Sequence, residues 1–171
     1  MQTHNPDYEQ LRVLSKVILE PGYCDEIISK YNIKLEHIIQ QSFRDVQIKN
    51  IDINDIINLK DSLITANKMH YKFNLNYDHV DCFFARYDTG MHYQSFHLDC
   101  IAGEYQRKLS FSLLLNEEFT GGEFELLEGN PLPAKKGKLL VFPSFLPHKI
   151  TPVTSQTRYV IFGWFYGPNF I

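Results

Sequence analysis

The sequence predicts one α+β domain in which N-terminal helices pack on a jelly-roll-like β core. Two segments before residue 70 carry apolar residues at helical spacing. The chain from residue 71 instead divides into short apolar stretches separated by Gly, Pro and Asn. At 171 residues the chain is long enough for one hydrophobic core and short for two. We therefore expect a single domain over 1–171, with helical support over about 1–70 and the β core over about 71–171.

The N-terminal part contains two predicted helices and one predicted strand. A short apolar run over 13–19 is compatible with an edge strand, and Pro21 then suits the first turn of a helix. Asn54 is a candidate N-cap for a second helix that continues to Ala66, with apolar residues at spacings of three and four. Residues 33–50 show no clear period, and we expect a helix followed by a loop there.

The remaining chain is expected to form the strands of the β core. Many short strands at this spacing are typical of a sandwich or barrel rather than of a βαβ sheet. Gly121-Gly122 is expected to form a hairpin turn that uses positive φ. The candidate strands are 71–76, 80–87, 108–115, 123–128, 138–142, 147–153 and 157–165.

Composition narrows the class of partner and the compartment. The net charge of -3 and the pI near 6.1 weigh against a nucleic-acid partner, because nonspecific nucleic-acid binders are usually basic. No apolar run is long enough to span a membrane, so no membrane partner is expected. Three cysteines without CxxC spacing suggest neither a disulfide framework nor a zinc ribbon. We expect a cytoplasmic protein.

Two His-x-Asp pairs are candidates for metal binding, His79-Val-Asp81 and His97-Leu-Asp99. Such pairs are common by chance in a chain with seven histidines and twenty acidic residues, so each alone is weak. On a strand, residues i and i+2 point to the same face, so an imidazole and a carboxylate can converge there. A second histidine from a later strand would complete a two-His, one-carboxylate triad, which suits non-haem Fe(II). His148 is the one histidine that follows His97.

Arg158 begins the last apolar strand, ten residues after His148. A guanidinium directed into an apolar barrel needs an anionic partner, because a lone buried charge is costly. Its planar fork matches a carboxylate. A dicarboxylate bound to the metal at one end would supply that partner at the other end.

These features together resemble the 2-oxoglutarate- and Fe(II)-dependent dioxygenases in their prolyl 4-hydroxylase-like branch. The resemblance covers about residues 65–171, and its strength lies in the order and spacing of seven elements. They are Arg86-Tyr87-Asp-Thr-Gly90, His97-x-Asp99, Leu113-Leu-Leu-Asn116 with Gly121-Gly122-Glu123, Phe142-Pro143-Ser144 with His148, Pro152-Val153, Arg158 and Trp164.

The resemblance implies a double-stranded β-helix (jelly roll) core and a set of site residues. It implies that His97, Asp99 and His148 bind Fe(II), and that Arg158 pairs with the distal carboxylate of 2-oxoglutarate. Tyr87, ten residues before His97, corresponds to a tyrosine that lines the cosubstrate pocket in this branch. The implied reactants are 2-oxoglutarate and O2, with ascorbate as the reductant.

The chain departs from the pattern of the branch at two positions. Collagen-type prolyl hydroxylases usually carry a lysine where this chain has Arg158, so it resembles the relatives that use arginine. Some relatives have a tyrosine near Leu114 that helps to hold the distal carboxylate. Its absence leaves Thr151, Ser112 or no hydroxyl at all for that role.

The implied activity is hydroxylation of an unactivated C–H bond, with a prolyl residue of a peptide or protein as the first choice of substrate. A free amino acid or other small molecule is the alternative substrate class. A jelly-roll module that binds metal without catalysis is the alternative of a different kind. Loops 88–96 and 100–107 flank the metal strand and are expected to set substrate specificity.

Overall fold

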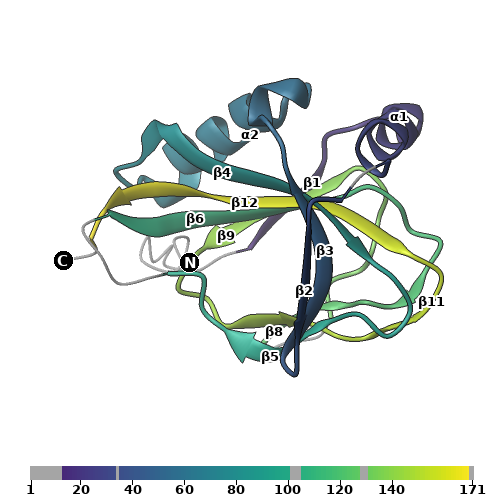
Figure 1. The fold of residues 1–171 in the computed structure, drawn as a ribbon. Coiled ribbons are helices and arrows are strands. Elements are labelled where there is room, and N and C mark those ends of the chain that lie inside the picture. The colour runs from purple at the N-terminus through teal and green to yellow at the C-terminus, as the bar shows by residue number, and fades with distance from the viewer. Residues whose placement is uncertain (1–12, 34, 101–104, 128–130, 170–171) are drawn as a thin grey trace, which may run out of the picture.

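The computed structural model describes residues 13–33, 35–100, 105–127 and 131–169. Its largest element is a seven-stranded sheet with the strand order β1-β9-β6-β12-β4-β3-β2, in which every neighbouring pair is antiparallel (Figure 1). The strands are β1 (Leu14–Val17), β2 (His37–Gln41), β3 (Arg44–Asn50), β4 (Asn76–Tyr87), β6 (Tyr105–Leu114), β9 (Lys138–Pro143) and β12 (Arg158–Pro168).

Two smaller sheets complete the double-stranded β-helix that the sequence predicts. One has the order β5-β10-β8, with β5 (Tyr93–His97), β10 (His148–Ile150) and β8 (Phe124–Leu126). The other pairs β11 (Val153–Ser155) with β7 (Thr120–Gly121). In Figure 1, β5 and β8 lie below the large sheet, and the helices lie above it.

The helices cover the outer face of the large sheet. Helix α1 (Pro21–Tyr31) begins at the proline that the sequence indicates and buries Cys24, Ile27 and Tyr31. Helix α2 (Leu59–Ala66) follows the short 3-10 helix η2 (Ile53–Asp55) and continues into the π-helical turn η3 (Asn67–Tyr71). Among the described residues, no helix has the length and apolar character needed to cross a membrane.

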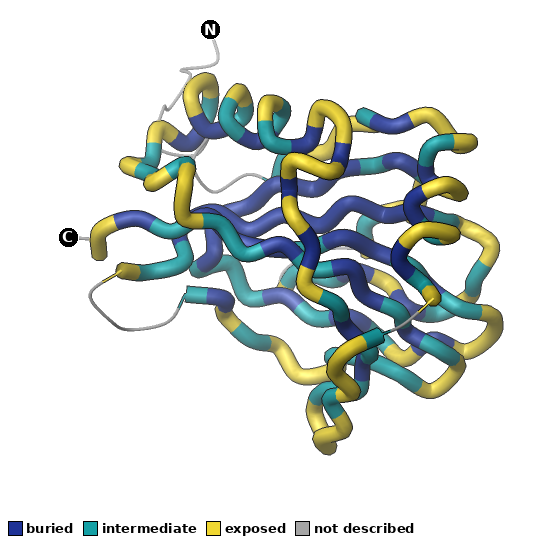
Figure 2. The backbone as a smooth tube through the Cα atoms, turned by 45° about the horizontal axis from the view of Figure 1, so that its top comes forward, coloured by how far each residue is buried: buried dark blue, intermediate teal, exposed yellow. Residues whose placement is uncertain are grey.

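Both faces of the large sheet are buried, because successive side chains of each strand point to opposite faces. In β4, Phe84 packs with the helices, while Ala85 belongs to a cluster on the inner face. In β12, Ile161 likewise packs with the helices and Val160 belongs to the cluster on the inner face. Figure 2 shows the resulting run of buried positions through the central strands. The inner face therefore forms one wall of the space between the sheets.

The prediction of helix and loop over 33–50 is wrong, because this segment contains the hairpin of β2 and β3. In β3, Val46 and Ile48 are buried and alternate with polar residues, which is the period of a half-buried strand. The hairpin pairs Gln41 with Arg44 across a turn that lacks the usual Asn-Gly or Asp-Gly signal. The N-terminal part thus contributes strands to the large sheet as well as helices.

Three further expectations need correction. Asn54 is not the N-cap of the second helix: it lies in η2, and Asn58 precedes α2 in a left-handed conformation. No strand covers 71–75, because η3 runs to Tyr71 and β4 starts only at Asn76. The expected strand 147–153 is divided into β10 and β11, with Thr151 and Pro152 between them.

Candidate metal centre

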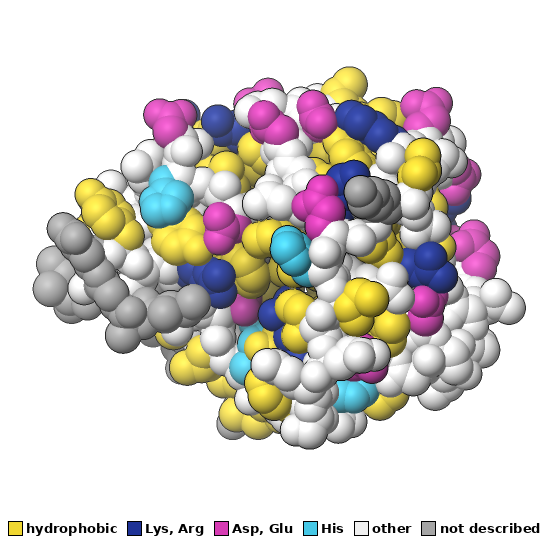
Figure 3. Space-filling view, viewed as in Figure 1, with side chains coloured by type: hydrophobic (Ala, Val, Ile, Leu, Met, Phe, Trp, Pro, Cys, Tyr) yellow, Lys and Arg dark blue, Asp and Glu magenta, His cyan; other side chains and the backbone are white. Residues whose placement is uncertain are grey.

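A cavity of about 390 Å³ lies between the inner face of the large sheet and the small sheet that contains β5 and β10. His97, Asp99, His148, Arg158 and Tyr87 all line it. Figure 3 shows a face that is hollowed near its middle, where basic, acidic and histidine side chains gather among hydrophobic ones. The structure thus brings all five sequence-predicted site residues to one cavity.

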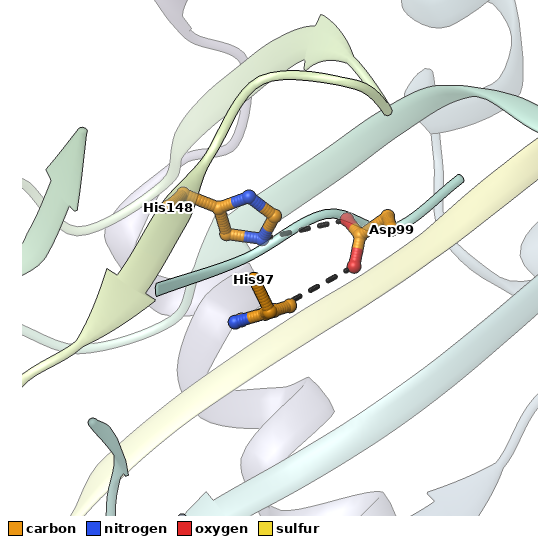
Figure 4. Close-up of side chains that lie close together, drawn as sticks. All are labelled: His97, Asp99 and His148. Carbon is orange, nitrogen blue, oxygen red and sulfur yellow. Dashed lines mark ion pairs between the residues drawn. The ribbon is translucent and has the colours of Figure 1, made fainter. Parts of the chain in front are cut away.

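His97, Asp99 and His148 converge on one point in this cavity (Figure 4). One potential ligand atom from each residue lies within 4.8 Å of the other two. Asp99 Oδ1 is 3.7 Å from His97 Nε2, and Asp99 Oδ2 is 3.4 Å from His148 Nε2. The two histidines come together because β5 and β10 are neighbours and pair His97 with His148. Two imidazoles and one carboxylate form the ligand set of a facial triad.

Backbone contacts select the tautomer of both imidazoles. His97 Nδ1 lies 3.0 Å from the Ser95 carbonyl, and His148 Nδ1 lies 2.9 Å from the Leu146 carbonyl. A carbonyl can only accept a hydrogen bond, so each Nδ1 donates to it and each Nε2 faces Asp99. Burial and the neighbouring His148 lower the pKa of His97 to about 4, so its ring is neutral at pH 7. Both rings therefore direct Nε2, the nitrogen that could bind a metal ion, toward the same point.

Asp99 follows the end of β5 and is held by residues of other segments. Strand β5 ends at His97, so the convergence of His97 and Asp99 does not come from the pleat of one strand, as the sequence suggested. The backbone N–H of Asp99 instead donates to the Ser144 carbonyl at 2.9 Å. The Ser110 hydroxyl donates to Asp99 Oδ2 at 2.8 Å and also contacts the Ser144 hydroxyl. These contacts orient the carboxylate toward the histidines.

Arg158 and Tyr87 form a second polar feature of the cavity. They face each other across β12 and β4, with the guanidinium carbon 5.3 Å from the centre of the Tyr87 ring. Both side chains are buried, and this burial lowers the pKa of Arg158 and raises the pKa of Tyr87. Arg158 Nε is buried and has no hydrogen-bond partner among the described residues. An unpaired buried cation is costly, so the arrangement suits a bound anion.

Gly122 lies directly against Arg158. It adopts φ +59°, as the sequence predicts for the Gly121-Gly122 pair, and a Cβ atom there would come within 2.9 Å of Arg158 Cδ. The glycine therefore serves both the turn and the close approach of the arginine side chain.

The two candidate hydroxyls are placed differently. Ser112 lines the cavity with Arg158. Thr151 is not among the lining residues, and its hydroxyl accepts a hydrogen bond of 2.8 Å from the backbone N–H of Glu123.

The competing pair His79-Val-Asp81 is engaged elsewhere. The His79 ring stacks on Tyr166, with centres 4.2 Å apart, and Asp81 accepts a hydrogen bond from the Tyr166 hydroxyl. Of the specificity loops, residues 101–104 lie outside the described residues.

Sequence reasoning missed two arginines that line the cavity, Arg44 and Arg107. Arg107 stacks on Trp164 at 3.6 Å and lies 3.8 Å from a carboxylate oxygen of Asp81. Arg107 is the last residue of the loop 100–107 that was expected to set specificity, and that position was the available signal. Arg44 begins β3, inside the segment misread as helix and loop, so no signal for it was available without the hairpin.

Comparisons with known proteins agree with this geometry. Residues 82–166 match the family model described as the 2OG-Fe(II) oxygenase superfamily. A PKHD-type hydroxylase from Acaryochloris marina is 37% identical over an alignment of 86 residues that covers 47% of this chain and 39% of that protein. A PKHD-type hydroxylase from Hyphomonas neptunium is 43% identical over 63 residues, covering 33% of this chain and 27% of that protein. The chain thus aligns with well under half the length of these relatives.

Solved structures share the fold. A prolyl-4-hydroxylase from Pseudomonas putida superposes with a TM-score of 0.76 at 22% identity, covering 95% of this chain and 96% of that one. A viral collagen prolyl hydroxylase from Paramecium Bursaria Chlorella virus-1, solved as a 2OG complex, gives a TM-score of 0.70 at 17% identity, covering 91% and 96%.

Proposed function

Through residues 82–166 the chain belongs to the 2OG-Fe(II) oxygenase superfamily, and we propose that it is an Fe(II)- and 2-oxoglutarate-dependent dioxygenase. The observation that carries the proposal is the presence, in one cavity, of the His97–Asp99–His148 cluster and of the buried Arg158, which has no counterion among the described residues. The residue cluster suits a metal ion, and the arginine suits the far end of an anion that is bound to this metal ion.

In this proposal His97, Asp99 and His148 hold Fe(II). Two imidazoles and one carboxylate match the donor set of non-haem iron, and three protein ligands leave room for other reactants. Fe(II), when bound, supplies the activation of O2 that the hydroxylation of an unactivated C–H bond requires. The contacts of Ser95, Leu146 and Ser110 keep the three ligands oriented for this task.

Arg158 binds the distal carboxylate of 2-oxoglutarate in this proposal. Its planar guanidinium can donate two parallel hydrogen bonds to a carboxylate, and that pairing would remove the cost of its burial. Tyr87, in contact with Arg158, lines the same part of the cavity, and Ser112 is the better placed of the two candidate hydroxyls. Aromatic side chains from both sheets exclude water around the cosubstrate. Ascorbate would serve as the reductant.

We propose a prolyl residue of a peptide or protein as the substrate. This choice is supported by relatives and structural neighbours named as PKHD-type and prolyl hydroxylases. One neighbour, from Trichoplax adhaerens, is a prolyl hydroxylase in complex with a peptide fragment.

The same reading extends to the chain as a whole. We propose that residues 1–171 form one domain, since β1 and β12, near opposite ends of the chain, belong to the same sheet. We propose a cytoplasmic location without a nucleic-acid partner, in line with three free cysteines and a net charge of -3.

The decisive experiment is anaerobic titration of the Fe(II)-loaded protein with 2-oxoglutarate, followed by visible absorption. We expect the weak charge-transfer band of the metal-bound cosubstrate, and then succinate formation once O2 is admitted with a prolyl peptide. The matched variants are His97→Ala, which should lose the band, and His79→Ala, which should keep it because that histidine lies outside the cavity. Iron binding without a band in the unmodified protein would contradict the proposal.

A further inference from the structure

The cavity contains more positively charged side chains than the proposed metal site and cosubstrate account for. Among the described residues that line it, Arg44, Arg107 and Arg158 are basic and Asp99 is the single carboxylate. Arg107 has Asp81 beside it at 3.8 Å and the hydroxyl of Tyr166 at 3.0 Å. Arg44 has no carboxylate within ion-pair distance in the part of the chain that the structure describes, and its Nε is buried without a hydrogen-bond partner. Arg44 is therefore the one lining charge left to explain.

The charges of the proposed reaction complex balance without Arg44. The charges of Fe(II) and Arg158 together offset those of Asp99 and the two carboxylates of 2-oxoglutarate. Arg107 is offset by Asp81. Arg44 is half-buried, and its buried Nε lacks a hydrogen-bond partner among the described residues, so an anion that enters the cavity can form a charge-assisted pair with it.

Arg44 is half-buried, and its guanidinium packs against an aromatic ring. Its guanidinium carbon lies 4.9 Å from the centre of the Tyr93 ring, which itself stacks on His97 at 3.6 Å. The hairpin that carries Arg44 is tied to β5 at its tip, because Gln94 donates to the carbonyls of Ser42 and Phe43. These contacts place a fixed positive charge one aromatic ring away from a proposed metal ligand.

From this geometry we propose that Arg44 binds a carboxylate of the primary substrate, so that the enzyme selects an acidic group next to the carbon it hydroxylates. The inference rests on the proposed function. It adds a substrate class, since the carboxylate can be the α-carboxylate of the target residue or the side chain of a neighbouring Asp or Glu. Either source presents the same planar anion to the guanidinium.

Binding of matched acids and amides tests the proposal without turnover. Trp164 is the single tryptophan of the chain and lines the cavity, so its fluorescence reports on cavity occupancy. The protein is held anaerobic with Fe(II) and saturating 2-oxoglutarate, which occupies Arg158. One pair of probes is N-acetyl-L-proline and N-acetyl-L-prolinamide. The other pairs are capped tripeptides with proline beside Glu or beside Gln, in both orders.

We expect at least one acid to bind about tenfold or more tightly than its amide, as a charge-assisted pair predicts. The pair that shows the preference identifies the source of the carboxylate. Arg44→Gln should remove the preference, and Arg44→Lys should keep part of it. Lys49→Gln is the matched control, because it removes one positive charge from the same strand outside the cavity, and it should keep the preference.

The outcomes separate this inference from the proposed function. If the charge-transfer band forms but no acid binds more tightly than its amide, the role of Arg44 is refuted. The same holds if Arg44→Gln keeps the preference, or weakens 2-oxoglutarate binding instead of probe binding. If the band itself does not form in the unmodified protein, the proposed function fails and the substrate inference fails with it.

Discussion

Replacing Arg158 with methionine should weaken 2-oxoglutarate binding and stabilise the protein without ligand. Arg158 is 4% exposed and its Nε lacks a hydrogen-bond partner among the described residues, so the burial of its charge is uncompensated before the cosubstrate binds. Methionine matches the arginine side chain as far as Nε, so it removes the charge while keeping the packing of the stem. The two effects have opposite signs, which distinguishes a binding residue from a structural one.

The size of each effect follows from the contacts. Two charge-assisted hydrogen bonds to a carboxylate contribute about 3 kcal/mol or more, so the dissociation constant of 2-oxoglutarate should rise about 100-fold. Removal of the unpaired charge should stabilise the ligand-free protein by about 1 kcal/mol, or a rise in Tm of about 2–4 °C for a chain of this size.

The assay combines the anaerobic absorption titration with thermal unfolding, with and without 2-oxoglutarate. At about 100 times its dissociation constant, the cosubstrate should stabilise the unmodified protein by about 2.7 kcal/mol, and Arg158→Met should lose most of that protection at the same concentration. Arg86→Met is the control, since Arg86 already pairs with Asp88 outside the cavity. An unchanged 2-oxoglutarate affinity in Arg158→Met, or a fall of several degrees in its ligand-free Tm, would refute the reasoning.

Three other changes have defined outcomes. Ser110→Ala removes the hydrogen bond that orients Asp99, so metal affinity in an Fe(II) or Mn(II) titration should fall about tenfold, and an unchanged affinity would exclude this orienting role. Gly163→Ala places a Cβ against a backbone carbonyl of β4, so urea unfolding should show a loss of several kcal/mol; a loss under 1 kcal/mol would mean that the strands can separate locally. Hydrogen bonds from Tyr31 and Lys30 lower the pKa of Asp55, so its stabilising effect is complete above the unfolded pKa near 3.9 and is lost as pH falls through the lower folded value. The free energy of unfolding of Asp55→Asn should therefore approach that of the unmodified protein at the acid end of this range. A difference that stays constant with pH would contradict the assignment.

The order of the proposed site residues was readable from the sequence alone. His97, Asp99, His148 and Arg158 are separated by spacings that match strands of one barrel, and the structure brings all four to one cavity. The long strands were also predictable, because their apolar runs are bounded by turn residues. The positive φ of Gly121 and Gly122 was also predictable, because two adjacent glycines stand where a hairpin turn was expected.

The local sequence pattern did not predict the hairpin of β2 and β3 or the turn η3. The alternation of Val46 and Ile48 is short, and the turn before it lacks a glycine or an asparagine, so the hairpin of β2 and β3 was missed. The π-helical turn η3 was also missed, because apolar and polar residues alternate directly after it and suggested that a strand begins at residue 71.

The sequence by itself determined which donor groups this protein possesses and in what order they follow, because strand period and side-chain chemistry are properties of short segments. Only the tertiary structure decided how they meet. Asp99 is oriented by Ser110 and Ser144, and Arg44 reaches the cavity from a hairpin more than 50 residues before the first proposed metal ligand. Both arrangements depend on strands that pair across long distances in the chain, and the free energy that selects such pairings comes from burying both faces of the sheet at once.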